Sequence, residues 1–151
     1  GQFWTPIGGQ VCTPIDSWAS KRSIDLYGHV VDPQAFTESI KVRGLGGPKG
    51  VKLLHQHENE WVIGRITRLE AKDDGVWIEA TIDEDISRGK DVAAMVKAND
   101  GLSFSVGFYP IDLDILEVGG TEILYISKGD LFEVSVCTFP AQENAIMEGS
   151  E

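Results

Sequence analysis

Apolar and polar residues alternate along several stretches of this chain, and a period of two predicts β-strands. The clearest case follows the Asp74-Gly75 turn, where every second residue from Val76 to Ile82 is apolar. Further strands are predicted over residues 24–31, 51–57, 61–71, 102–109 and 130–138, with a hairpin over 112–127 that turns at Gly119-Gly120. Many short strands separated by turn residues are typical of a closed or half-closed barrel.

Two segments carry helix signals instead. Asp32-Pro33 predicts a helix start, because aspartate caps a helix and proline fits its first position. Ser87 predicts a second start, for a helix from about Arg88 to Ala98. Apolar residues follow at Phe36, Ile40 and Val42 in the first segment, and at Val92, Met95 and Val96 in the second.

We therefore expect a mainly β fold with α, a single-domain antiparallel β-barrel of about seven strands with two or so flanking helices. One domain suits a chain of 151 residues. Residues 1–24 are expected to form an irregular N-terminal segment, and the polar tail over 141–151 is expected to fray.

Charge and cysteine content narrow the function classes. The chain carries 24 acidic and 13 basic residues, a net charge of −11, which disfavours binding to nucleic acid. No apolar run approaches the roughly 18 residues that span a bilayer, and no signal peptide is visible, so no membrane partner is expected. Cys12 and Cys137 form no disulfide framework or CxxC motif, which suits two small buried residues in a reducing compartment.

His55 and His57 are the first candidates for chemistry. Alternate residues of a strand share a face, so the predicted strand over 51–57 would present both imidazoles together. A metal site of this HxH type wants a glutamate four or five residues further on, but Trp61 and Val62 occupy those positions. We therefore assign no metal site; metal binding stays an alternative beside two others, exposed or satisfied histidines and a general base.

Two serines supply candidate nucleophiles. In the strand over 102–109, Ser103, Ser105 and Gly107 fall on one face, opposite an apolar face formed by Phe104, Val106 and Phe108. Small residues on one face are consistent with simple packing, or with room for a substrate. The segment is not a GxSxG nucleophile elbow, because serine replaces the second glycine.

Glu133 is the third candidate. It lies in the run Leu131 to Cys137, where Phe132, Val134 and Val136 predict an apolar face and Glu133 lies opposite them beside Ser135. A serine needs an adjacent base, and a carboxylate can orient the imidazole that serves as one. The sequence alone does not show that the three side chains meet.

Taken together, these segments resemble the prohead protease family of tailed bacteriophages, which is related in fold to herpesvirus assemblin. The resemblance covers roughly residues 25–146. The segments that carry it are DLYGHVVDPQAF at 25–36, VKLLHQH at 51–57 followed by IGR at 63–65, SVGF at 105–108, and DLFEVSVCTFPA at 130–141. Each is weak alone, but their order and spacing together are fairly specific.

The resemblance implies a serine endopeptidase with a His-Ser-Glu triad in which His57 is the base and Glu133 the third member. Ser105 is preferred as nucleophile because Gly107-Phe108 anchors it without a gap; anchoring on Gly101-Leu102 instead selects Ser103. No cofactor is implied.

The implied partners are the capsid protein precursor and its scaffolding segment, together with further copies of the chain as a homo-oligomer. The implied location is the host cytoplasm, inside the assembling prohead, where the protease also processes itself. Two alternatives remain: a non-catalytic β-barrel that serves as a scaffold or assembly protein, and a metal-dependent hydrolase that uses His55 and His57.

Overall fold

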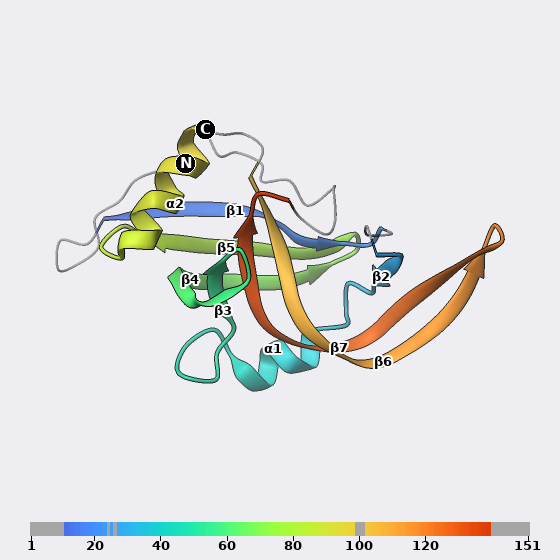
Figure 1. Cartoon of the computed structure of the whole chain (residues 1–151). Helices are drawn as coiled ribbons and strands as arrows, with labels where there is room; N and C mark the ends of the chain where they lie inside the picture. The colour runs from blue at the N-terminus through green and yellow to red at the C-terminus, as the bar shows by residue number, and fades with distance from the viewer. Residues whose placement is uncertain (1–10, 24, 26, 99–101, 140–151) are drawn as a thin grey trace.

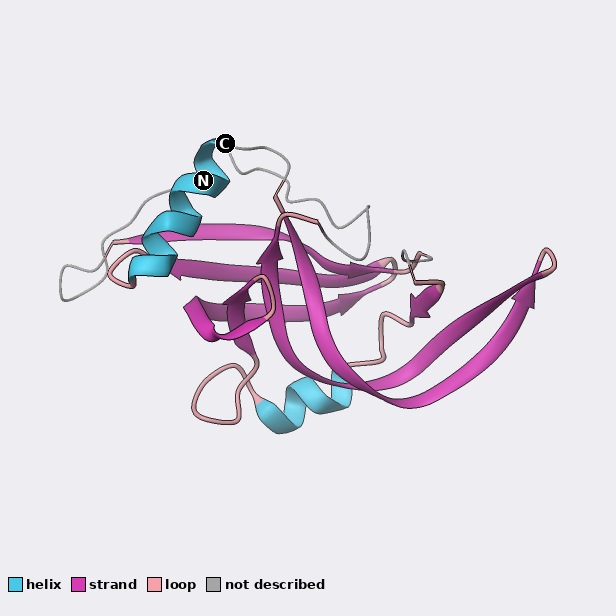
Figure 2. Cartoon of the chain, viewed as in Figure 1, coloured by secondary structure: helices cyan, strands magenta, loops and turns pink. Residues whose placement is uncertain are grey.

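A computed structural model describes residues 11–23, 25, 27–98 and 102–139. In this part of the chain, seven strands and two helices follow one another (Figures 1 and 2). They are β1 (Cys12–Lys21), β2 (His29–Val31), α1 (Thr37–Arg43), β3 (Lys52–His55), β4 (Glu58–Lys72), β5 (Gly75–Asp83), α2 (Ser87–Ala98), β6 (Ser103–Val118) and β7 (Thr121–Cys137).

The seven strands form one curled sheet that resembles half of a barrel. The strand order is β1-β5-β4-β3-β7-β2, and β6 pairs with β7 along almost its whole length. The expected mainly β fold of about seven strands with two helices is confirmed. It departs from an antiparallel barrel at two pairings, since both β2 and β3 run parallel to β7 and the sheet is mixed. β2 and β3 lie on either side of β7, and the connection that joins them contains α1.

The apolar face of the sheet forms one core. All four alternating residues predicted between Val76 and Ile82 are buried, which confirms that strand and its apolar face. Helix α2 packs against β4 and β5 through Val92, Ala93 and Val96. Phe36 and Phe104 are the largest side chains with no exposed surface.

Three boundaries differ from the sequence expectations. Residues 12–21 form β1, a regular strand paired with β5, so the prediction of an irregular segment there is wrong. Helix α1 begins at Thr37, because the Asp32 carboxylate accepts a hydrogen bond from the Gln34 amide and closes a separate turn first. The expected fraying of 141–151 lies outside the described residues.

The strands predicted over 102–109, 112–127 and 130–138 are in fact two continuous strands, β6 and β7. Pro110 does not break β6, since β6 has a ladder on β7 alone and its other edge does not need the missing N–H. Gly129 does not interrupt β7. Glycine is suited to this position because a Cβ there would lie 2.9 Å from the ring of Phe36. The turn at Gly119-Gly120 is where the sequence predicts it, and both residues have positive φ.

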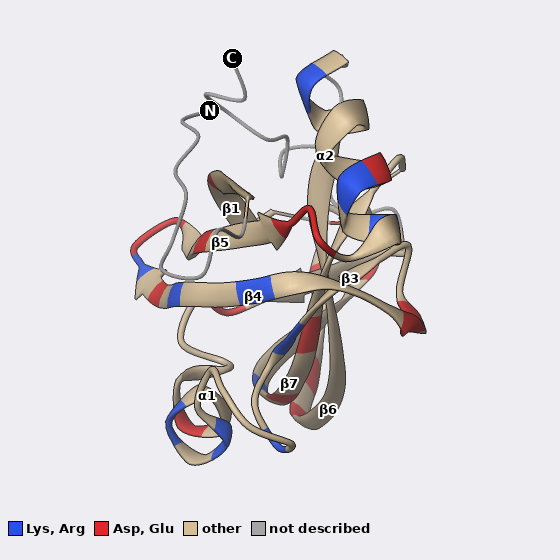
Figure 3. Ribbon diagram, turned by 90° about the vertical axis from the view of Figure 1, so that its left-hand side faces the viewer, with Lys and Arg blue, Asp and Glu red and all other residues tan. Residues whose placement is uncertain are grey.

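Towards its turn at Gly119-Gly120 the β6–β7 hairpin extends away from the body as an arm (Figure 1), and β2 pairs with it at Leu124, Tyr125 and Ile126. Its strand β6 carries three acidic residues and no basic one, whereas basic residues lie on α1, α2 and β4 (Figure 3). No helix among the described residues is long and apolar enough to cross a membrane.

Candidate active site

His57 lies in the tight turn that joins β3 to β4, not on the strand with His55 as the sequence suggested. The two central residues of the turn, Gln56 and His57, have φ values of 56° and 59°. Residues other than glycine rarely adopt such φ values. Each costs about 1–3 kcal/mol and persists only where the surrounding structure holds it. The strained backbone of this turn therefore lowers the stability of the fold while it places the imidazole of His57.

Strand β7 and the residue after it hold this turn in place. The Gln56 amide donates to the Val136 carbonyl at 3.1 Å, and the Gln56 side chain donates to the Thr138 hydroxyl at 2.8 Å. The His57 amide donates to the hydroxyl oxygen of Ser135 at 2.9 Å. These three bonds fix the position of His57 over the polar face of β7.

His55 has different partners and does not join this group. Its ring is buried and packs 5.7 Å from the ring of Trp61, which also carries the Arg88 guanidinium at 3.8 Å. Burial, together with the positive charge of Arg88, lowers the pKa of His55. Among the described residues no group of three or more His, Cys, Asp or Glu side chains is arranged to hold a metal ion.

Glu133 meets His57 directly. One carboxylate oxygen, Oε1, forms a hydrogen bond with Nδ1 of His57, and the other, Oε2, accepts a hydrogen bond from the Ser135 hydroxyl at 2.6 Å. Only 2% of Glu133 is exposed. A carboxylate buried this deeply needs such partners, because an unpaired buried charge is costly.

A β-bulge sets the position of Glu133 on β7. Gly107 pairs with Glu133 and the next residue of β6, Phe108, pairs with Leu131, so Phe132 is the extra residue of the bulge. The alternation predicted Phe132 on the apolar face, but the bulge removes it from the core. Its ring stacks on that of Tyr109 instead, with ring centroids 4.7 Å apart. Leu131 takes the core position instead.

The carboxylate of Glu133 lies directly over Gly107. A Cβ built on Gly107 would stand 2.1 Å from Oε1 of Glu133, so no larger residue fits without moving that carboxylate. Glycine at this position is therefore a requirement of the His57–Glu133 contact.

We expect Gly107→Ala to lower kcat/KM of the activity proposed below by about 10–100-fold, because the displaced carboxylate no longer orients His57. The matched control is Gly46→Ala, since a Cβ on Gly46 meets nothing within 4 Å. Steady-state kinetics of both variants check this expectation. Equal activity of the two variants would contradict it.

Two neighbours raise the pKa of His57 to about 10, through hydrogen bonding to Cys137 first and to Glu133 second; burial opposes this shift, and the charges of the two neighbours contribute less than burial does. The raised pKa means that the fold favours the protonated form of the His57 imidazole.

The two candidate serines lie on β6, on the same face as this pair. Ser105 is paired with Ser135 in the β6–β7 ladder, and Ser103 is paired with Cys137. Ser105 keeps 7% of its surface exposed, while Ser103 keeps none and its hydroxyl has no hydrogen-bond partner. Within the described structure, no hydrogen bond joins His57 to either serine. The fold thus brings two of the three predicted side chains into contact and places the third on the adjacent strand.

A depression of about 390 Å³ opens beside His57 and Glu133. Val106, Phe108, Tyr109 and Phe132 form its apolar and aromatic walls, and His57, Glu133 and Asn59 form the polar part of its lining. Apolar pockets with a few polar groups are typical of ligand sites.

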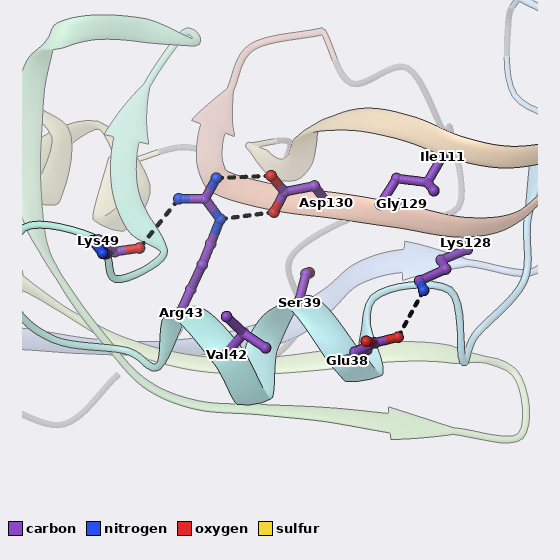
Figure 4. A pocket seen from close by; sticks show the side chains of 9 residues that line it. All are labelled: Glu38, Ser39, Val42, Arg43, Lys49, Ile111, Lys128, Gly129 and Asp130. Carbon is purple, nitrogen blue, oxygen red and sulfur yellow. Dashed lines mark hydrogen bonds and ion pairs between the residues drawn. The ribbon is translucent and has the colours of Figure 1, made fainter.

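A larger hollow of about 570 Å³ lies elsewhere, between α1 and the base of the arm (Figure 4). Arg43 spans it with a two-pronged ion pair to Asp130, at 2.7 and 2.8 Å. Its lining includes neither His57 nor Glu133, so it is not part of the candidate active site.

Sequence reasoning missed the roles of Ser135 and Cys137. The spacing of Glu133, Ser135 and Cys137 does place them on one strand face, which was the available signal. Nothing in the sequence shows that a turn from β3 reaches this face.

The fold is that of the herpesvirus proteases. The varicella-zoster virus protease superposes with a TM-score of 0.51 at 12% identity, covering 90% of this chain and 63% of that one. The KSHV protease, in a complex with a hexapeptide phosphonate inhibitor, gives a TM-score of 0.49 at 11% identity, with 89% and 63% covered. The chain thus spans less than two thirds of the length of either protein.

Residues 16–151 match the family described as caudovirus prohead serine protease. The chain belongs to this family, as its sequence motifs predicted. A search of curated protein sequences finds no match.

Proposed function

We propose that this protein is a serine endopeptidase that cleaves the capsid precursor and its scaffolding segment during prohead maturation, and that it also processes itself. Membership of the prohead protease family supports the reaction class. The observation that carries the assignment of residues is the contact between the imidazole of His57 and the buried carboxylate of Glu133, beside a strand face that bears serines. The proposed location is the assembling prohead in the host cytoplasm.

We assign the nucleophile to Ser105. An imidazole with a hydrogen bond of about 2.8 Å at each nitrogen links atoms roughly 7–8 Å apart. The Glu133 carboxylate lies over Gly107, and Ser105 is two residues, or about 7 Å, from Gly107 along β6. Ser103 is four residues away, about 13 Å, which is too far for one ring to span.

Ser103 remains the alternative to test, for one reason. It stands opposite Cys137, which also contacts the imidazole of His57. Against it are its complete burial and the distance from Glu133.

In the proposed mechanism, the Ser105 oxygen attacks the scissile carbonyl carbon while its proton passes to the neutral imidazole of His57 at Nε2. Glu133 accepts the hydrogen bond from Nδ1, which fixes the tautomer and stabilises the imidazolium that forms. The imidazolium then donates its proton to the leaving amine. Water hydrolyses the acyl-enzyme by the same route in reverse.

Incubating the purified protein with a capsid precursor that carries its scaffolding segment tests this function. We expect cleavage products with the protein as described and none with His57→Ala, since the serine then lacks a base. Mass spectrometry of the products identifies the cleavage sites. An equal lack of cleavage by both proteins would favour the non-catalytic assembly role instead.

A further inference from the structure

We propose that Ser135 is a positioning residue of the active site, which holds the backbone of His57 and the carboxylate of Glu133 in a fixed relation. This inference rests on the proposed function, in which those two residues act together. Ser135 lies on β7, two residues beyond Glu133, and none of its surface is exposed.

The hydroxyl of Ser135 uses both its donor and an acceptor site. It donates to Oε2 of Glu133 at 2.6 Å and accepts from the His57 amide at 2.9 Å. Because a hydroxyl offers one donor and two acceptor positions, one atom can serve both residues at once. A hydrophobic side chain of similar size would leave both groups without these partners.

Each of these bonds bears on the catalytic geometry. The bond to Oε2 occupies one oxygen of Glu133 and leaves Oε1 for Nδ1 of His57. The bond to the amide helps hold His57 at a positive φ that it would not otherwise favour. Ser135 therefore ties together two elements, the β3–β4 turn and strand β7, whose side chains must meet.

Burial and position distinguish this role from that of a nucleophile. The hydroxyl proton of Ser135 already points to a carboxylate, and the side chain has no exposed surface for a substrate to approach. On the neighbouring strand, Ser105 is paired with Ser135 in the ladder and keeps 7% of its surface exposed, so its hydroxyl is the more accessible of the two.

The test compares Ser135→Ala with Ser39→Ala. Ser39 is a matched control because its hydroxyl also donates once, to the Phe36 carbonyl at 3.2 Å, and accepts once, from the Leu131 amide at 3.0 Å, away from the active site. We expect Ser135→Ala to lower kcat about 30-fold with KM unchanged, and Ser39→Ala to leave both unchanged. A kcat within threefold of the unaltered protein would overturn the proposal.

A double-mutant cycle with Glu133→Gln separates positioning from simple stabilisation. If Ser135 acts through the His57–Glu133 pair, its removal costs less than threefold once Glu133→Gln has already weakened that pair. Independent effects would multiply, and a full 30-fold loss in the double variant would contradict the proposal. Ser135→Thr keeps the hydroxyl and is expected to restore kcat, which covers the case in which the alanine variant folds poorly.

One readout does not depend on proteolysis. The proton on Nδ1 of His57, held by Glu133, should give a downfield imidazole N–H resonance in the NMR spectrum of the intact chain. We expect the resonance to persist in Ser39→Ala and to be lost or shifted in Ser135→Ala. If no cleavage is detected with the unaltered protein but the resonance behaves as stated, the proposed function fails while the positioning role stands; an unchanged resonance in Ser135→Ala refutes the positioning role.

Discussion

Ser105→Ala is expected to reduce cleavage of a scaffold-bearing capsid precursor to background, a loss of roughly 10⁴-fold or more. No other group in the proposed mechanism can form the acyl bond. Ser105 is paired with Ser135 and lies two residues along β6 from Gly107, over which the Glu133 carboxylate lies. This separation is about the distance that one hydrogen-bonded imidazole can bridge. Time-resolved gel analysis of precursor cleavage checks the expected loss.

Ser103→Ala is the paired measurement. Because the Ser103 hydroxyl is buried and makes no hydrogen bond, its removal should leave the rate of cleavage within about twofold. An inactive Ser103→Ala protein together with an active Ser105→Ala protein would reverse the assignment of the nucleophile.

Glu133→Gln is expected to change both the height and the position of the pH–rate profile. The neutral imidazole is the reactive form, so kcat/KM should rise with pH, with a midpoint well above 6.5 because the pKa of His57 is raised to about 10. Glutamine removes the negative charge, so the midpoint should move to lower pH. The plateau should fall by about 10²-fold or more, since the imidazolium formed in the reaction loses its carboxylate.

The same shift affects stability in a defined direction. Hydrogen bonding to Cys137 first, and then to Glu133, raises the folded pKa of His57 from 6.5 to about 10, so the contribution of the protonated imidazole to stability is fully present below pH 6.5 and is lost as the pH rises through about 10. The predicted change in the pH–rate profile is checked by measuring kcat/KM against pH for the unaltered protein and for Glu133→Gln. A midpoint that is the same with and without the Glu133 carboxylate would contradict the assigned partner.

The sequence predicted the strands whose patterns are set by local alternation, such as the one from Val76 to Ile82. It missed β1, because nothing in the local pattern of residues 12–21 shows that they pair with β5. It also placed Phe132 in the core, since a bulge that inserts one residue on β7 reverses the alternation without a local signal.

For the site, the motifs selected His57 and Glu133, and the structure joins them. The route to that contact was not predictable from the strand pattern, because His57 reaches Glu133 from a turn with positive φ and not from a strand face. The sequence assigns no role to Ser135, because that role depends on its hydrogen bond with His57, which is 78 positions away in the sequence. Contacts of this range depend on the whole sheet.

The most direct test of the proposed triad is to treat the purified protein with a serine-reactive phosphonate and identify the modified residue by mass spectrometry. We predict one label per chain, on Ser105, formed faster as pH rises and lost in His57→Ala. Absence of any label on Ser105, with the protein folded and the His57–Glu133 contact intact, would contradict the account.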